Sequence, residues 1–159
     1  MSLCPSSLDS LAPFSSTLSV LLNEEGGIID DMLVTKLDHE ERFYVVTNAG
    51  RSVEDRYWIK KKVDDWNAHV RREGGGRRER EGEVIKWETL DGWGLLALQG
   101  PKAVEVLQSL TQMDLGGMKF GQSGYVEIGK EGVRCHVARG GYTGEDGFEV
   151  GSSPHITKI

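Results

Sequence analysis

Short apolar runs that end in turn-forming residues recur along this chain, and this pattern limits its possible folds more than any other feature. The run Thr17–Asn23 ends in Asn-Glu-Glu-Gly-Gly, and a second run, Ile28–Leu37, follows directly. Two such runs around a glycine turn predict a β-hairpin. The next run, Phe43–Asn48, is rich in aromatic and β-branched residues that suit a pleated surface, so it predicts a third strand.

A different period follows the third run and predicts a helix through about Arg71. Ser52 opens the sequence Ser-Val-Glu-Asp, in which Ser52 can cap the first turn and Asp55 can reach back to it. Apolar residues then recur at spacings of four, three and four, which predicts a buried stripe on one helix face. The members of that stripe are Ile59, Val63, Trp66 and Val70.

The second half of the chain repeats the alternation of strands and one helix. Val84–Leu90 and Trp93–Leu98 flank Asp91-Gly92, which predicts another hairpin, and Gly124–Ile128 and Val133–Ala138 predict two more strands. Gly100-Pro101 predicts a helix start, because proline's missing N–H is no loss in a first turn. Its predicted buried face consists of Ala103, Val106, Leu107 and Leu110.

This order of elements predicts an α+β fold, with antiparallel sheets and helices packed on one face. Gly74–Gly82 is glycine-rich with mixed charge, so it predicts a solvated loop between two modules. We therefore expect one subdomain at 1–75 and a second α+β subdomain at 76–159.

Composition excludes several functional classes. The formal net charge is −6, which argues against nucleic-acid binding. No apolar run approaches the roughly 20 residues that span a bilayer. Cys4 and Cys135 are far apart, and the histidines form no cluster with them, so neither a disulfide framework nor a metal site is expected. The first residues, Met1 to Pro13, contain no Arg or Lys, so no import signal is expected at this start.

Two adjacent carboxylates, Asp30 and Asp31, interrupt the otherwise apolar second run. Side chains alternate faces along a strand, so the two should point to opposite sides of the sheet. Their neighbours are mostly apolar, so at least one is expected in a partly buried place, where a carboxyl group with a raised pKa could orient or accept a proton. The alternative is an edge strand whose aspartate is solvated or caps a turn.

The segment Arg139–Glu149 has four glycines in eight positions, which allows backbone to approach a ligand closely. Tyr142 offers a ring face for stacking, and Glu149 offers a hydrogen-bond acceptor. The segment has neither the lysine of a P-loop nor the glycine spacing of a dinucleotide fingerprint. A binding loop and an ordinary glycine-rich turn fit these residues equally well.

Four motifs in this order resemble the aminomethyltransferase family, the T-protein of the glycine cleavage system, from about Ser6 to Val150. They are Gly-Gly-Ile-Ile-Asp-Asp (26–31), Thr-Asn-Ala-Gly (47–50), Leu-Ala-Leu-Gln-Gly-Pro (96–101) and Gly-Tyr-Thr-Gly-Glu-Asp-Gly-Phe-Glu (141–149). The resemblance implies a tetrahydrofolate site with Asp31 as the catalytic residue. It also implies that Glu149 binds the pterin and that Tyr142 and Asn48 are pocket residues. Some relatives carry an aromatic residue where this chain has Thr35, so no contact is carried over there.

The implied reaction transfers the aminomethyl carbon from the lipoyl arm of the partner H-protein to tetrahydrofolate, with release of ammonia and without a metal. Family members work in the mitochondrial matrix when they are eukaryotic. They are much longer than this chain, and a folate-binding arginine of the family lies beyond the position where Gly151–Ile159 ends. The expectation is a fragment truncated at both ends that binds folate weakly or not at all. The alternatives are another folate-binding member of the wider superfamily and a non-catalytic interaction module.

Overall fold

The computed structural model describes residues 3–37, 42–73 and 84–153, and these residues form two compact units. The described residues of unit 1 fall within Met1–Ser7, Leu18–Val34 and Val45–Thr89, and those of unit 2 fall within Leu8–Thr17, Thr35–Tyr44 and Leu90–Ile159. The predicted loop and module boundary near residue 75 lie outside the described residues, so the division at 75 stays a prediction.

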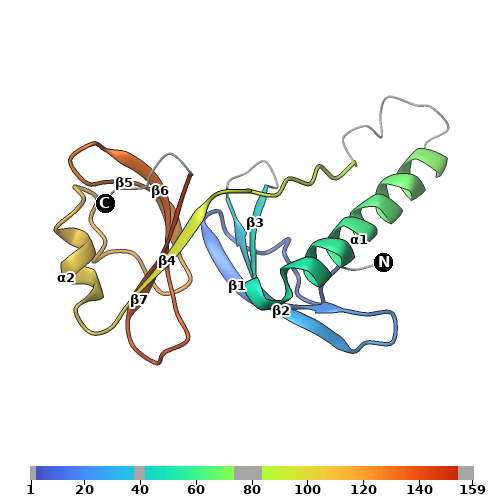
Figure 1. The fold of residues 1–159 in the computed structure, drawn as a ribbon, viewed down its shortest axis with the longest axis horizontal. Helices are drawn as coiled ribbons and strands as arrows, with labels where there is room; N and C mark the ends of the chain where they lie inside the picture. Colours follow the sequence, from blue (N-terminus) through green and yellow to red (C-terminus); the bar gives the residue numbers. More distant parts are fainter. Residues whose placement is uncertain (1–2, 38–41, 74–83, 154–159) are drawn as a thin grey trace. The chain divides into compact units, whose positions relative to one another are not determined.

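The first sheet confirms the predicted hairpin and third strand. Its strands are β1 (Ser15–Leu22), β2 (Ile28–Lys36) and β3 (Phe43–Thr47), in the order β1-β2-β3 (Figure 1). Asn23 closes the turn between β1 and β2, because its side-chain oxygen accepts the backbone N–H of Gly27 at 2.7 Å. Gly26 sits at φ 83, a left-handed conformation that glycine adopts without strain.

The predicted helix is confirmed as α1 (Ser52–Glu73), which follows the 3-10 turn η1 (Ala49–Arg51). Ile59, Val63 and Val70 are buried as expected, whereas Trp66 keeps 38% of its surface exposed. Lys62 also fastens the helix to the first hairpin through an ion pair with Glu24 at 2.7 Å.

The hairpin predicted around Asp91-Gly92 is wrong. Only its second half is a strand, β4 (Gly94–Gln99), while residues 84–90 form no strand. The backbone of Ile85 instead bonds to the Asn67 side chain of α1, with its N–H donating to Oδ1 at 2.8 Å and its carbonyl accepting from Nδ2 at 2.9 Å. The Asn67 amide therefore bonds the N–H and the carbonyl of Ile85, the two groups that a partner strand would otherwise have bonded.

The second sheet has four antiparallel strands in the order β4-β7-β6-β5. The predicted strands are confirmed as β5 (Ser123–Ile128) and β6 (Val133–Arg139), while β7 (Gly147–Ser152) was not predicted as a strand. The antiparallel α+β class is confirmed.

The short helix α2 (Ala103–Gln108) contributes to the core of unit 2. It begins at Ala103, after a turn at Gly100-Pro101, and buries Ala103 and Leu107. Val106 and Leu110 were expected in the core and are instead 47% and 39% exposed, because the short element turns only one narrow face inward. The core cluster comprises Ala103, Leu107, Leu115, Met118, Val126, Ile128, Cys135, Val137, Phe148 and Val150. Across the described ranges, no helix is long and apolar enough to cross a membrane.

Candidate functional site

In unit 1, the side chain of Asn48 brings the two adjacent carboxylates together. Its amide nitrogen, Nδ2, donates to Asp30 Oδ1 at 3.0 Å and to Asp31 Oδ1 at 2.5 Å. The alternation that sends the two side chains to opposite faces of β2 therefore does not keep their carboxylates apart. Two of the predicted site residues, Asp31 and Asn48, are in direct contact.

Asn48 makes these contacts from the residue just before η1. At that place an asparagine side chain often caps the helix, but here it forms no capping bond. The backbone carbonyl of Asn48 accepts the Arg51 N–H at 3.0 Å and closes the turn, so the side chain is available for the carboxylates. The local fold thus uses the backbone of Asn48 in the turn and its amide in the site.

The two carboxylates differ in exposure. Asp30 is half-buried, as expected for at least one of the pair, whereas Asp31 is exposed. Asp30 Oδ1 also accepts the backbone N–H of Asp31 at 3.0 Å. Burial alone would raise the pKa of Asp30, but hydrogen bonds from Asn48, Asp55 and the Asp31 N–H, with the charge of Arg51, lower it below its usual value. Asp30 is therefore an internal anion, and the neighbouring Asp31 carboxylate is accessible from solvent.

The expectation that Asp55 closes a capping box is wrong. Asp55 is 0% exposed, and neither of its carboxylate oxygens has a hydrogen-bond donor in bonding geometry among the described residues. Its side chain lies against Asp30 instead. Burial, followed by the hydrogen bond and the negative charge of Asp30, raises the pKa of Asp55 to about 6 despite the opposing effects of Thr47 and Arg51. The spacing of residues along α1 carries no information about β2, so the contact of Asp55 with Asp30 could not be predicted from it.

In unit 2, Glu149 lies on β7 among small residues on the sheet face opposite the core. It pairs with Ala97 of β4 and Ala138 of β6, and residues directly opposite each other in antiparallel strands share a face. Gly147 and Gly151, two positions away along β7, share that face as well. The neighbours of Glu149 within the sheet are therefore small, and the larger side chains on this face are Gln99 beside Gly147 and Tyr44 beside Gly151.

The Glu149 carboxylate is poised to accept external hydrogen bonds. Within residues 3–37, 42–73 and 84–153, no side chain or backbone group donates a hydrogen bond to it, and burial raises its pKa. Its charge adds to burial in raising the pKa of Tyr44. The Tyr44 ring in turn packs against His136 with ring centroids 4.9 Å apart. Glu149 therefore sits beside an aromatic group with its acceptor oxygens unused.

The Gln99 side chain fills the space beside two glycines of the glycine-rich segment. Its amide nitrogen donates to the Gly140 carbonyl at 3.1 Å, and its oxygen accepts the Thr143 hydroxyl at 3.3 Å. A Cβ atom added at Gly141 or Gly147 would overlap the Gln99 side chain. Two of the four sequence motifs thus meet at this glutamine, which was not predicted as a functional residue.

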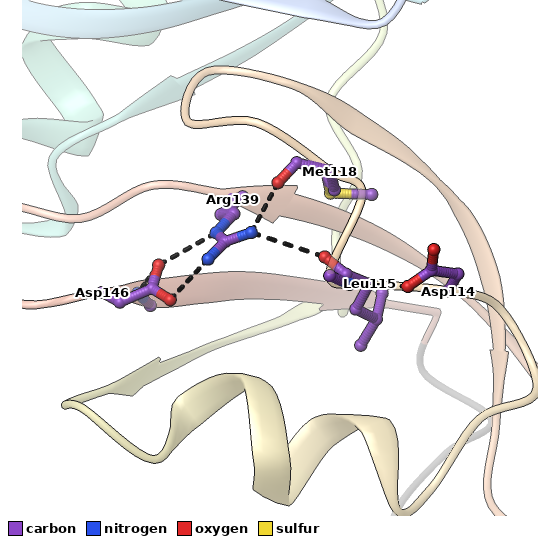
Figure 2. A network of polar contacts seen from close by, with 7 residues as sticks. Asp114, Leu115, Met118, Arg139 and Asp146 are labelled. Carbon is purple, nitrogen blue, oxygen red and sulfur yellow. Dashed lines mark hydrogen bonds and ion pairs between the residues drawn. The ribbon is translucent and has the colours of Figure 1, made fainter.

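A second brace fixes the two ends of the same loop. Arg139 Nε and Nη2 donate to the two oxygens of Asp146 at 2.9 and 2.6 Å, and Nη1 donates to the Met118 carbonyl at 2.6 Å and to the Leu115 carbonyl at 3.5 Å (Figure 2). The hydrogen bond from Arg139 lowers the pKa of Asp146. An arginine fork matched to a carboxylate is a rigid arrangement, so residues 140–146 leave the sheet from a fixed base.

Tyr142 lies on this braced loop and is 92% exposed. The structure thus brings Asp31 and Asn48 into contact in unit 1, whereas Glu149 and Tyr142 belong to unit 2, where no hydrogen bond among the described residues joins them. Sequence reasoning missed the supporting residues Asp55, Gln99 and Arg139, although Gln99 and Arg139 stand inside or next to the motifs. In the part of the chain that the structure describes, no three histidine, cysteine or acidic side chains form a metal-binding group.

Comparison with known proteins assigns the family. The chain is 43% identical over 150 residues to the probable mitochondrial aminomethyltransferase of Schizosaccharomyces pombe, covering 94% of this chain and 34% of that protein. It is 39% identical over 151 residues to the mitochondrial aminomethyltransferase of Saccharomyces cerevisiae, covering 92% and 34%. The chain thus spans about a third of the length of these curated relatives.

A solved structure agrees. The crystal structure of glycine cleavage system aminomethyltransferase T from Bartonella henselae matches with a TM-score of 0.65 and 31% identity, over 98% of this chain and 36% of that one. The family model described as "GCVT N-terminal domain" matches residues 1–157. Since that match covers nearly the whole sequence, the chain belongs to the GCVT N-terminal domain family.

Proposed function

We propose that this protein contributes to a tetrahydrofolate-dependent aminomethyltransferase of glycine cleavage. The donor is the aminomethyl group held on the lipoyl arm of the partner H-protein. Its carbon forms bonds to N5 and N10 of tetrahydrofolate to give 5,10-methylenetetrahydrofolate, while the carbon–sulfur bond breaks to leave the reduced lipoyl arm and the carbon–nitrogen bond breaks to release ammonia. The mitochondrial relatives favour the mitochondrial matrix as the place where the protein acts.

The observation that carries the proposal is the state of Asp31. This carboxylate is exposed, yet Asn48 holds one of its oxygens at 2.5 Å. A group that is both oriented and accessible can hydrogen-bond a nitrogen of the incoming folate and favour its nucleophilic form. Most of the rate gain would come from holding that nitrogen and the adduct carbon in reacting geometry.

Glu149 and Tyr142 supply what a pterin ring requires. The ring edge carries neighbouring N–H donors, and the unused Glu149 carboxylate can accept two of them side by side. The strand neighbours Ala97 and Ala138 have short side chains, so a flat ring can approach the Glu149 carboxylate between Gln99 and Tyr44. Tyr142 offers its exposed ring for stacking, from a loop that Gln99 and Arg139 keep in place.

The test is ammonia release from aminomethyl-loaded H-protein in the presence of tetrahydrofolate. We expect a slow but measurable rate for the chain, a loss of kcat in Asp31→Asn, and a raised KM for folate in Glu149→Gln. Two matched variants control for the change in charge. They are Asp64→Asn on α1, where Asp64 forms an exposed ion pair with Lys60, and Glu127→Gln on β5, where Glu127 is exposed.

Each outcome has a distinct meaning. If Asp31→Asn retains the wild-type rate, the assignment of Asp31 as the catalytic residue is wrong. If all variants and the wild type stay at the background rate, the chain is a non-catalytic interaction module that keeps the fold without the chemistry.

A further inference from the structure

Three carboxylate oxygens are buried where the start of α1 meets β2, and none has a hydrogen-bond partner in good geometry among the described residues, although the Thr47 hydroxyl lies near enough to lower the pKa of Asp55. They are both oxygens of Asp55 and Oδ2 of Asp30. Two ionised carboxylates in one buried place repel each other, and leaving each without a donor costs several kcal/mol. A single proton between them replaces the repulsion with a strong O–H···O⁻ hydrogen bond.

The surroundings decide which of the two carboxyl groups keeps that proton. Asp30 Oδ1 accepts two N–H groups at 3.0 Å, from Asp31 and from Asn48, and both bonds favour the ionised form. Asp55 accepts no N–H bond from the described residues, and burial, followed by the effect of Asp30, raises its pKa to about 6 against the opposing effects of the Thr47 hydroxyl and the Arg51 charge. Asp55 is therefore the acid, and Asp30 Oδ2 is its acceptor.

The acceptor is connected to the site. Asp30 Oδ1 accepts the Asn48 amide, whose same nitrogen also holds Asp31, so the buried Oδ2 is the oxygen left for the Asp55 proton. A carboxylate anchored through both oxygens cannot rotate, so the amide that it shares with Asp31 has a fixed position.

We propose that Asp55 is a positioning residue, whose carboxyl proton binds Asp30 and thereby fixes the Asn48 amide against Asp31. This proposal rests on the proposed function only where it treats Asp31 as the reacting carboxylate. Neither the comparisons nor the sequence motifs assign a role to Asp55.

The arrangement depends on pH in a defined direction. The groups that act on Asp55 are Asp30 of β2, the Thr47 hydroxyl of β3 and the Arg51 guanidinium of η1, while Asp31 lies next to Asp30. As the pH rises through the Asp55 pKa of about 6, the proton is lost and the two carboxylates repel each other. Asp30 is then no longer held in place, so the Asn48 amide loses the fixed position of its hydrogen-bond acceptor.

The test follows the Asn48 side-chain amide and the Asp55 carboxyl carbon by NMR in the whole 159-residue chain. In the wild type we expect both signals to shift with a shared midpoint near pH 6. In Asp55→Asn, whose amide donates at every pH, the Asn48 signal should stay at its low-pH position. The control Glu54→Gln removes an exposed acid from the same helix turn and should titrate like the wild type.

An Asn48 signal that does not move in the wild type, or one that titrates equally in Asp55→Asn, would overturn the proposal. The wild-type titration needs no variant to fold. Ammonia-release assays add a second readout, the ratio of Asp55→Asn kcat to wild-type kcat, which should be one at pH 5 and rise above one towards pH 8. If the titration appears but Asp31→Asn keeps full activity, the proposed function fails while the Asp55–Asp30 arrangement stands. If the titration is missing but Asp31→Asn is inactive, only the positioning role fails.

Discussion

Replacing Asp55 with asparagine should stabilise the protein at high pH and leave it nearly unchanged at low pH. The folded-state pKa of Asp55 is raised to about 6 from its ordinary 3.8, so the folded state binds more protons than the unfolded state between these values. Wild-type stability from this group is therefore present below pH 3.8 and lost as the pH rises through about 6. The Asp55→Asn variant should not lose this stability, because its side chain does not ionise.

The size of the effect follows from the two pKa values. Their difference corresponds to about 3 kcal/mol, at about 1.4 kcal/mol for each unit. Asp30, the other member of the pair, is half-buried and adjoins the exposed Asp31, so solvent screening reduces the expected gain to about 1–2 kcal/mol.

Urea unfolding followed by helical circular dichroism measures this gain, because α1 is the long helix of unit 1. The difference in unfolding free energy between Asp55→Asn and the wild type should grow between about pH 4 and pH 8, the range that spans the folded-state pKa. Glu54→Gln, which neutralises an exposed acid in the same turn, should show no such growth. An Asp55→Asn variant that is less stable than the wild type at the upper end of this range would refute the reasoning, because it would show that the buried carboxylate is well compensated.

Three further predictions concern unit 2. Gly147→Ala should displace the Gln99 side chain and lower the free energy of unfolding by about 1–2 kcal/mol, because Gln99 loses its two hydrogen bonds. The effect should be smaller in a Gln99→Ala background, which a double-mutant cycle on thermal unfolding measures. Arg139→Lys should cost about 1–3 kcal/mol in urea unfolding, because an ammonium group cannot reproduce the fork to Asp146, and a loss under about 0.5 kcal/mol would count against the brace. Burial lowers the pKa of His136 to about 4, so the stability that the neutral imidazole contributes is present above pH 6.5 and lost as the pH falls towards 4. In His136→Phe, the loss of unfolding free energy on acidification should be smaller by up to about 3 kcal/mol. A variant with the same pH profile of stability as the wild type would contradict this prediction.

Periodic elements could be predicted from the sequence, and elements held by distant side chains could not. The first hairpin, α1, β5 and β6 show regular apolar spacing, and all four are confirmed. Strand β7 was not predicted, because only Phe148 and Val150 are apolar in a segment that also contains Gly147, Glu149 and Gly151. Residues 84–90 have a strand-like composition, but their backbone at Ile85 bonds to the Asn67 side chain instead.

The candidate site divides in the same way. The motifs identified Asp31, Asn48, Tyr142 and Glu149 through the family resemblance, and their roles remain proposals. The contact between Asn48 and Asp31 joins residues 17 positions apart, and no local rule predicts it. The spacing of Asp55 from Ser52 predicts a capping acid, whereas its burial against β2 depends on the tertiary fold.

The central claim is that the exposed, amide-held Asp31 carboxylate acts on the folate nitrogen. The most direct measurement is the rate of ammonia release from aminomethyl-loaded H-protein at saturating tetrahydrofolate, compared between wild type and Asp31→Asn, with Asp64→Asn as control. We predict that Asp31→Asn falls to the background rate while Asp64→Asn keeps the wild-type rate. Equal rates above background for wild type and Asp31→Asn would contradict the claim.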